Sequence, residues 1–240
     1  MNYEIISDNC ENYLILSDDI LNNLSNDLCN IKQLIDKYPH KWEKVKKNIH
    51  DHEYVYTSSF YKKNLASVIP ISRSYFKMKE ILIDYDIKLL NKNITAIAEA
   101  PGGFIQCLLE NYSNDIIING ITLISENNKV PYWNKKLINH KNIKFHRGIK
   151  NNGDLYDLGN ILSLINNIGR ESSSLITGDG GFDNSADYNN QEFNSLKLIY
   201  SEIFLTLNIQ CKGGTFICKF FDIFLKETIS LLYILYLSYE

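Results

Sequence analysis

Two charged residues in this chain occupy positions where a charge is costly or useful. Lys219 lies in the apolar segment 215–220, and a buried ammonium group needs a partner or a shift towards its neutral form. Asp179 follows the apolar run 175–177 and precedes two glycines. An Asp at the carboxyl end of a parallel strand points into the crevice where such sheets bind ligands. We expect both residues in that crevice; the alternatives are a surface lysine and a loop-capping Asp.

A second glycine pair, Gly102 and Gly103, follows the apolar run 94–98 and precedes a helical stretch that begins at Phe104. Adjacent glycines let the backbone approach a ligand closely, and the first N–H groups of the helix then face that ligand. A tight structural turn explains the same residues equally well. The glycines alone therefore do not decide between the two interpretations.

The elements that must position these residues alternate along the chain. We expect strands at 94–98, 116–124, 143–145, 174–177 and 215–220, and helices at 72–85, 104–110, 161–168, 192–209 and from about 226 onwards. This alternation predicts an α/β fold in which a mostly parallel sheet is covered by helices on both faces.

The region before this fold carries apolar residues at helical spacing between 20 and 52, without a recognisable motif. A chain of 240 residues is long enough for one sizeable α/β core and an accessory segment. We therefore expect a helical accessory segment at 1–67 and the main domain at 68–240.

The charge of the chain is unevenly distributed, although the net charge is only −3. The stretch from Lys129 to Lys150 contains seven basic and no acidic residues, together with Tyr132, Trp133 and Phe145. Basic and aromatic side chains suit single-stranded RNA through phosphate contacts and base stacking. A solvated surface is the alternative interpretation.

The five cysteines form no C-x-x-C pair and no metal-ligand spacing with the histidines. The first residues lack the basic and apolar regions of a signal peptide. The apolar run 229–239 is shorter than the roughly 20 residues that span a bilayer, so we expect a packed helix there. We expect an intracellular protein, in the cytoplasm, the nucleus or, for a viral protein, the host cytoplasm, with no metal and no membrane partner.

Five blocks of this sequence resemble, in order, the FtsJ-like (RrmJ-type) 2′-O-methyltransferase family. Within that family the resemblance is closest to enzymes that methylate the ribose of the first transcribed nucleotide of capped mRNA. The blocks lie at 72–78, 100–104, 153–155, 178–182 and 213–224. Their order and spacing are more specific than any single block. The resemblance implies a Rossmann-like methyltransferase fold, S-adenosyl-L-methionine as the cofactor and RNA, most closely capped mRNA, as the substrate.

The resemblance also assigns site residues. The catalytic residues of the family fall on Lys77, Asp179 and Lys219. Its cofactor contacts fall on Ser72, Glu99, Ala100, Pro101, Gly102, Gly103, Phe104, Asp154 and Asp179. Ser72 stands where cap methyltransferases often have an Asn. By the general logic of such folds, Glu126 is a further candidate for the cofactor ribose hydroxyls.

The chemistry implied is methyl transfer to a ribose hydroxyl, which is a poor nucleophile until its proton is removed. Lys219 would be the base, Lys77 would supply nearby positive charge, and Asp179 would orient Lys219. No metal is needed for this reaction. Methylation of ribosomal or transfer RNA and a catalytically inactive scaffold are the alternatives.

The catalytic set of the family has a fourth member, a Glu on a later strand, and this sequence ends before such a strand. Glu240 is not a convincing match. Missing strands would leave the segment 215–220 as an open, apolar sheet edge. We therefore expect the C-terminal strands to be missing, and the sequence to be part of a longer reading frame.

A chain extended by its natural downstream sequence should accordingly be more stable and more active than residues 1–240 alone. Thermal unfolding and methyl transfer to RNA measure both properties side by side. Equal stability and equal activity would contradict the expectation.

Overall fold

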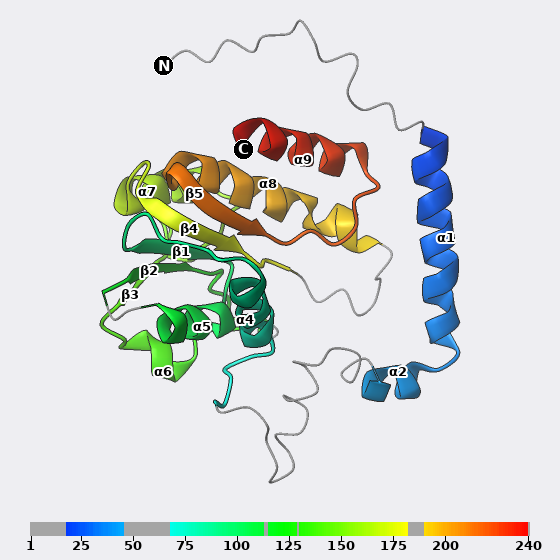
Figure 1. Ribbon diagram of the computed structural model, residues 1–240, viewed down its shortest axis with the longest axis horizontal. Helices are drawn as coiled ribbons and strands as arrows, with labels where there is room; N and C mark the ends of the chain where they lie inside the picture. The colour runs from blue at the N-terminus through cyan, green and yellow to red at the C-terminus, as the bar shows by residue number, and fades with distance from the viewer. Residues whose placement is uncertain (1–17, 46–67, 113–114, 129, 182–189, 240) are drawn as a thin grey trace, which may run out of the picture. The chain divides into compact units, whose positions relative to one another are not determined.

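The computed structural model describes residues 18–45, 68–112, 115–128, 130–181 and 190–239, and Figure 1 shows its ribbon. The chain divides into two compact units, residues 1–43 and 44–240. Helix α1 (Asp18–Asp36) is amphipathic and is followed by the short helix α2 (Pro39–Val45). Residues 46–67 lie outside the described part, so the expected boundary at residue 67 stays a prediction.

A parallel sheet forms the centre of the second unit. Its strands are β1 (Asn93–Ile97), β2 (Ile117–Ile121), β3 (Ile143–His146), β4 (Ser173–Gly178) and β5 (Gln210–Cys218). Their order in the sheet is β3-β2-β1-β4-β5, and every neighbouring pair is parallel. Along the sequence, β2 and β3 are added on one side of β1, and β4 and β5 are then added on its other side. This reversal lies between β1 and β4, where open α/β sheets bind ligands.

Helices cover both faces of the sheet, which confirms the predicted fold class (Figure 1). One face carries α4 (Ser74–Asp84), α5 (Gly103–Asn111) and α6 (Lys135–Ile138), and the other carries α7 (Leu158–Ile168) and α8 (Gln191–Ile209), with α9 (Lys226–Ser238) packed on α8. Within the described ranges, no helix combines the length and the apolar character needed to cross a membrane.

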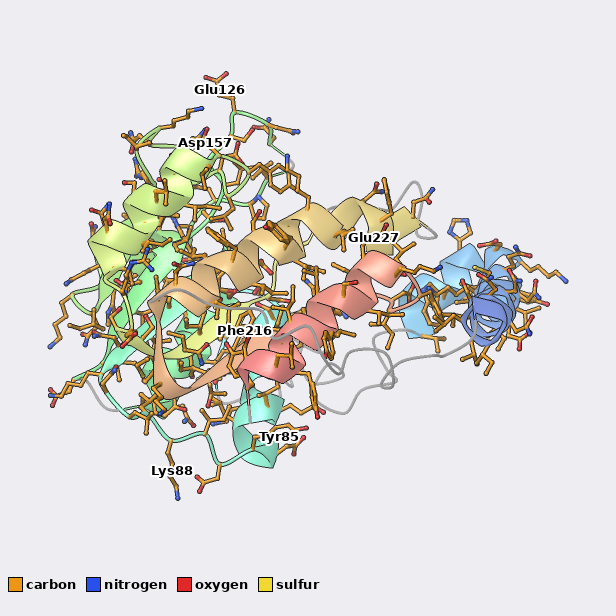
Figure 2. All side chains as sticks on the ribbon, turned by 90° about the horizontal axis from the view of Figure 1, so that it is seen from above. Tyr85, Lys88, Glu126, Asp157, Phe216 and Glu227 are labelled. Atoms are coloured by element: carbon orange, nitrogen blue, oxygen red, sulfur yellow. The ribbon has the colours of Figure 1, made fainter. Side chains whose placement is uncertain are left out.

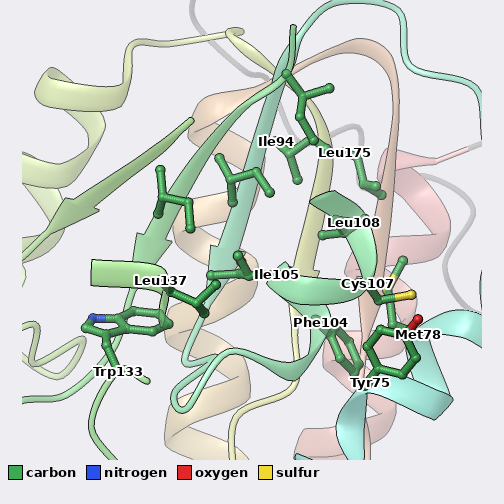
Figure 3. Packing of buried hydrophobic residues seen from close by; sticks show 14 of the residues in the cluster. Tyr75, Met78, Ile94, Phe104, Ile105, Cys107, Leu108, Trp133, Leu137 and Leu175 are labelled. Atoms are coloured by element: carbon green, nitrogen blue, oxygen red, sulfur yellow. The ribbon is translucent and has the colours of Figure 1, made fainter. Parts of the chain in front are cut away.

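The alternation of side chains along the central strands builds a separate core on each face. Ile94 of β1 and Leu175 of β4 pack beneath α4 and α5, whereas the adjacent Ile176 packs against α7 and α8. Figure 3 shows the first of these cores, in which α5 contributes Ile105 and Leu108, one helical turn apart. The periodicity read from the sequence therefore places the sheet and its two layers correctly.

The predicted strands differ from the observed ones at several ends, and β5 begins at Gln210, five residues before its predicted start. Strand β5 ends at Cys218 and not at residue 220, because its partner β4 ends at Gly178, in register with Cys218. Lys219 consequently lies just beyond the strand, although its N–H still donates to the Gly178 carbonyl at 2.9 Å. Strand β2 similarly ends at Ile121, in register with the ends of β1 and β3. The strand prediction for residues 122–124 and 219–220 was wrong.

Helix α6 is absent from the predicted elements. It begins after Asn134, whose side chain accepts a hydrogen bond from the N–H of Lys136 at 3.0 Å, as an N-cap does. Residues 182–189 of the expected polar loop, Lys129 and Glu240 lie outside the described residues.

Candidate functional site

A cavity of about 690 Å³ opens at the carboxyl ends of the strands. This volume falls within the range of about 300–1,000 Å³ that is typical of small-molecule sites. Its lining comes from the segments that follow each of the strands β1 to β5, and includes Ala98, Ala100, Thr122, Leu123, Gly153, Asp154, Leu155, Tyr156, Asp179, Gly181, Lys219 and Phe221. The cavity therefore gathers residues from four of the five blocks that the sequence singled out.

Asp179 and Lys219 are in contact at the edge of this cavity. The Lys219 Nζ lies 2.8 Å from the Asp179 Oδ1 and donates to the Asp179 carbonyl oxygen at 2.9 Å. It also lies 4.8 Å from the centre of the Phe221 ring. The side chains of Lys219 and Asp179 are 29% and 13% exposed, so the ammonium is held in place but remains open to the cavity.

Lys77 lies in the first turn of α4 with an exposed side chain. Its neighbours Tyr75, Phe76 and Met78 are buried and fix the helix on the sheet. The charge of Lys77 lowers the pKa of the buried Glu99 carboxyl, so the two groups interact electrostatically. The structure thus brings Asp179 and Lys219 into direct contact, and Lys77 into the electrostatic surroundings of Glu99.

Glu99 stands at the turn between β1 and α5 and is 3% exposed. Its Oε1 accepts a hydrogen bond from the backbone N–H of Phe104 at 2.6 Å, at the start of α5. The pKa of the Glu99 carboxyl is raised to about 8, mainly by burial and in smaller part by the nearby Asp179. The Phe104 N–H and the lysine charges act in the opposite direction. At neutral pH this carboxyl is therefore largely protonated.

The glycine turn is packed tightly from both sides. A Cβ on Gly102, which has a φ of +110°, would lie 2.2 Å from the Leu137 Cδ1. A Cβ on Gly103 would lie 2.2 Å from the Oγ atoms of both Ser72 and Ser74, which are 2.7 Å apart. The positive φ of Gly102 and the close packing around Gly103 give both glycines a structural role, and the cofactor-binding interpretation of this turn stays a prediction.

The other predicted residues of this turn have different surroundings. Ala100 lines the cavity, and the carbonyl of Pro101 accepts from the N–H of Asn134 at 3.1 Å. The Phe104 side chain is 4% exposed and packs in the core (Figure 3). Only the backbone of Phe104 therefore participates in the turn.

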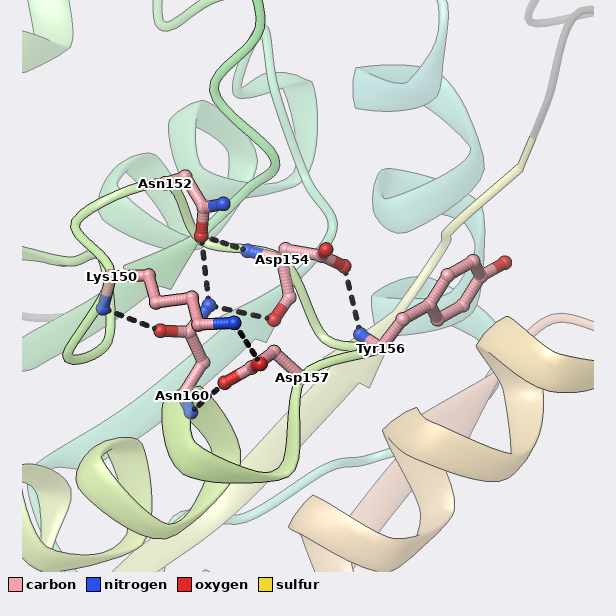
Figure 4. Close-up of polar contacts among 6 residues, drawn as sticks. All are labelled: Lys150, Asn152, Asp154, Tyr156, Asp157 and Asn160. Atoms are coloured by element: carbon pink, nitrogen blue, oxygen red, sulfur yellow. Dashed lines mark hydrogen bonds and ion pairs between the residues drawn. The ribbon is translucent and has the colours of Figure 1, made fainter.

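Asp154 lines the cavity on a loop held by side-chain hydrogen bonds (Figure 4). The fully buried Asn160 donates to the Asp154 carbonyl at 2.9 Å and to the Asn152 Oδ1 at 2.8 Å, and accepts from the Lys150 N–H at 2.8 Å. The Asp154 Oδ1 accepts from the N–H of Tyr156 at 2.8 Å. This network fixes the backbone on which the Asp154 carboxylate stands.

Glu126 is exposed at the periphery of the molecule (Figure 2). Its neighbour Asn127 lines the cavity instead. The interpretation of Glu126 as a partner for the cofactor ribose has no support in this position.

The aromatic part of the basic stretch belongs mostly to the core. Trp133 is 6% exposed, and its ring centroid lies 4.6 Å from that of Phe145. Tyr132 is exposed, and its hydroxyl accepts from the Arg147 guanidinium at 3.4 Å. Trp133 and Phe145 are thus engaged in packing beneath the sheet, and Tyr132 is the aromatic residue of this stretch that faces solvent.

Sequence reasoning missed Glu202 of α8, which is 0% exposed. Its Oε1 accepts from the N–H of Gly180 at 3.2 Å. The pKa of the Glu202 carboxyl is raised to about 8, mainly by burial; the Lys219 charge and the Gly180 N–H oppose this rise, and Asp179 adds to it. A signal existed: Leu198, Glu202, Leu205 and Ile209 recur at helical spacing, so Glu202 occupies an apolar-face position.

Several other cavity-lining residues were also missed, among them Tyr156 and Leu198. The ammonium of Lys197 lies 4.3 Å from the centre of the Tyr156 ring, which links α8 to the Asp154 loop. Within the described residues, no group of three or more His, Cys, Asp or Glu side chains is arranged to hold a metal ion.

Sequence comparisons relate this chain to known proteins. The model of the family described as FtsJ-like methyltransferase matches residues 70–240. The cap-specific mRNA (nucleoside-2′-O-)-methyltransferase 1 of Caenorhabditis elegans is 38% identical over 97 residues, which are 39% of this chain and 11% of that protein. The Trypanosoma cruzi protein of the same name is 31% identical over 142 residues, or 58% of this chain and 38% of that protein. The matches thus span well under half of either relative.

A solved structure, described as a putative ribosomal RNA methyltransferase from Plasmodium falciparum, aligns with a TM-score of 0.47 and 24% identity. The alignment covers 69% of this chain and 85% of that one.

The raised pKa values of the buried Glu99 and Glu202 carboxyls predict that the stability of the protein depends on pH. Their pKa rises from 4.5 to about 8 on folding, so the stability they contribute is complete below pH 4.5 and is lost as the pH rises towards 8. The free energy of unfolding should fall across this window, by at most ~1.4 kcal/mol per pH unit for each group. Glu99→Gln and Glu202→Gln should each flatten this slope in urea unfolding between pH 5 and pH 8. Slopes parallel to the wild type would disprove the assignment.

Proposed function

This chain belongs to the FtsJ-like methyltransferase family, and from that premise we propose that it transfers a methyl group from S-adenosyl-L-methionine to an RNA ribose 2′-hydroxyl. FtsJ-like methyltransferases in general depend on this cofactor and act on RNA. The observation that carries the proposal is the contact between Lys219 and Asp179 at the edge of the cavity. This contact fixes the Lys219 amine and the Asp179 carboxylate at a place where a cofactor and a substrate hydroxyl could meet.

The residues around the cavity suit this cofactor. A Cβ on Gly153 would lie 1.9 Å from the Thr122 carbonyl oxygen, so the Asp154 loop lies directly against the end of β2. The Asp154 carboxylate can accept from an adenine amino group, and Asp179 can face a positively charged sulfonium. We assign the cofactor contacts to the turn Glu99–Phe104 and to Ser72, Asp154 and Asp179, with Ala100, Asp154 and Asp179 lining the cavity directly.

Lys219, in its neutral amine form, would take the proton of the ribose hydroxyl on its Nζ while the hydroxyl oxygen bonds to the methyl carbon and S-adenosylhomocysteine leaves, since a neutral alcohol is a poor nucleophile. The Asp179 carboxylate and carbonyl orient this Nζ, and the Phe221 ring lies beside it. Lys77 would contribute a further positive charge from α4. When bound, S-adenosyl-L-methionine supplies a methyl group on a cationic sulfur. In-line geometry then depends on how rigidly the chain holds the reacting groups.

We propose capped mRNA as the substrate, and the ribose of its first transcribed nucleotide as the target. The names of the Caenorhabditis and Trypanosoma relatives support this choice.

Residues 68–240 would form the catalytic domain and residues 1–67 a helical accessory segment. An mRNA-processing role also favours an intracellular location.

The substrate assignment predicts a preference for capped RNA. Labelled methyl groups from S-adenosyl-L-methionine should be incorporated faster into capped transcripts than into uncapped transcripts of the same sequence. Equal rates would overturn the cap assignment in favour of ribosomal or transfer RNA. Absence of transfer to either transcript would favour an inactive scaffold.

The assignment of Lys219 as the base predicts that Lys219→Ala lowers kcat for methyl transfer by about 100-fold or more, the usual contribution of a general base. Binding of S-adenosylhomocysteine, measured by calorimetry, should be largely retained. Lys212→Ala is the matched control, because Lys212 lies exposed near the opposite end of β5 and its loss should leave kcat unchanged. Full activity of Lys219→Ala would refute the assignment.

A further inference from the structure

Glu202 is a carboxyl group buried in an apolar surface, on the face of α8 that packs against β4. It is 0% exposed. Burying a carboxyl is costly unless it makes compensating hydrogen bonds. Of its two oxygens, Oε1 accepts from Gly180, whereas Oε2 has no hydrogen-bond partner among the described residues. A Leu at this position would continue the apolar face formed by Leu198 and Leu205, so packing alone does not explain the Glu.

The hydrogen bond to Glu202 reaches the catalytic pair through a single peptide unit. Glu202 Oε1 accepts from the N–H of Gly180 at 3.2 Å. The carbonyl of the same peptide unit belongs to Asp179 and accepts from the Lys219 Nζ at 2.9 Å. Because a peptide unit is planar and rigid, fixing its N–H also fixes the direction of its carbonyl. Glu202 and Lys219 therefore hold opposite edges of one peptide plane.

The glycines on either side of Asp179 make room for this carboxyl. A Cβ on Gly178 would lie 2.9 Å from the Glu202 Oε2, and a Cβ on Gly180 would lie 2.3 Å from its Oε1. Side chains at these positions would push the carboxyl away from the turn. The glycines and Glu202 thus form one complementary arrangement, in which Glu202 approaches the backbone behind Asp179 from the side of α8.

We propose that Glu202 is a positioning residue that sets the orientation of the Asp179–Gly180 peptide and, through it, the place of the Lys219 amine. The inference rests on the proposed function in that Lys219 is the base. The alternative is that Glu202 only stabilises the fold. The two differ in what an apolar replacement does to the reaction rate.

The experiment compares Glu202→Leu with Glu202→Gln and with the control Glu192→Leu. Glu192 lies on the same helix, is 9% exposed, and accepts from the Leu225 N–H at 2.8 Å, so its replacement removes a comparable buried hydrogen bond elsewhere. Glu202→Leu should fold, because a leucine of similar size avoids the desolvation cost of a buried carboxyl. Its kcat should fall by up to about 100-fold, as for a misplaced catalytic group, while KM for RNA stays near the wild-type value.

Glu202→Gln keeps a carbonyl oxygen that can accept from Gly180 and should restore most of kcat. Glu192→Leu should keep the wild-type kcat. An unchanged kcat in Glu202→Leu, a Gln variant as slow as the Leu variant, or an equal loss in Glu192→Leu would each overturn the inference.

A second readout does not depend on catalysis. In protein labelled with ¹⁵N-glycine, the Gly180 amide should exchange its hydrogen faster in Glu202→Leu than in the wild type or Glu202→Gln. Unchanged exchange would overturn the inference even if RNA is methylated. If the wild type transfers no methyl group, the proposed function fails, and this exchange measurement alone decides whether Glu202 positions the peptide.

Discussion

A parallel sheet brings the carboxyl ends of all its strands to one edge, and this constraint underlies the whole site. The order β3-β2-β1-β4-β5 places β1 and β4 side by side at the point where the chain reverses direction across the sheet. Segments that are far apart in the sequence, such as those of Glu99, Asp154, Asp179 and Lys219, thereby surround one cavity. No local feature of any single segment could create this arrangement.

The electrostatics of the site follow from burial. Two carboxyl groups, Glu99 and Glu202, lie inside the protein next to Asp179, and desolvation holds both of them largely protonated at neutral pH. Each accepts a backbone N–H at the start of a glycine-containing segment. They can therefore act as hydrogen-bonding groups in the interior without adding two full negative charges beside the Asp179–Lys219 pair.

Much of the fold could be predicted from the sequence, because apolar periodicity reports local structure directly. The sheet, its two helical layers and the position of Asp179 after β4 all follow from it. The end of β5 could not be predicted, because a strand ends where its partner ends, and the β4 partner turns at Gly178. The aromatic residues of the basic stretch were ambiguous for a similar reason: their burial depends on α6, which is short and begins at a side-chain cap.

The candidate site was predicted less completely than the fold. Family resemblance supplied residues in motifs, and the contact between Asp179 and Lys219 is present in the structure. Glu202 was missed because its importance lies in a contact between a helix and a distant turn. A polar residue within an apolar helical face was the visible signal. A glycine in the sequence also has two possible explanations, because the absence of a side chain gives space either to a ligand or to a neighbouring side chain.

The hydrogen-bond network around Asn160 has a thermodynamic consequence. The Asn160 side chain forms hydrogen bonds with the backbone of Lys150 and Asp154 and with the side chain of Asn152. Asp157 is the N-cap of α7 and follows this loop in the sequence. A loop that is already ordered loses little conformational entropy when a small molecule settles against it. The Asp154 side of the cavity is in this sense preorganised, and affinity there can come from few contacts.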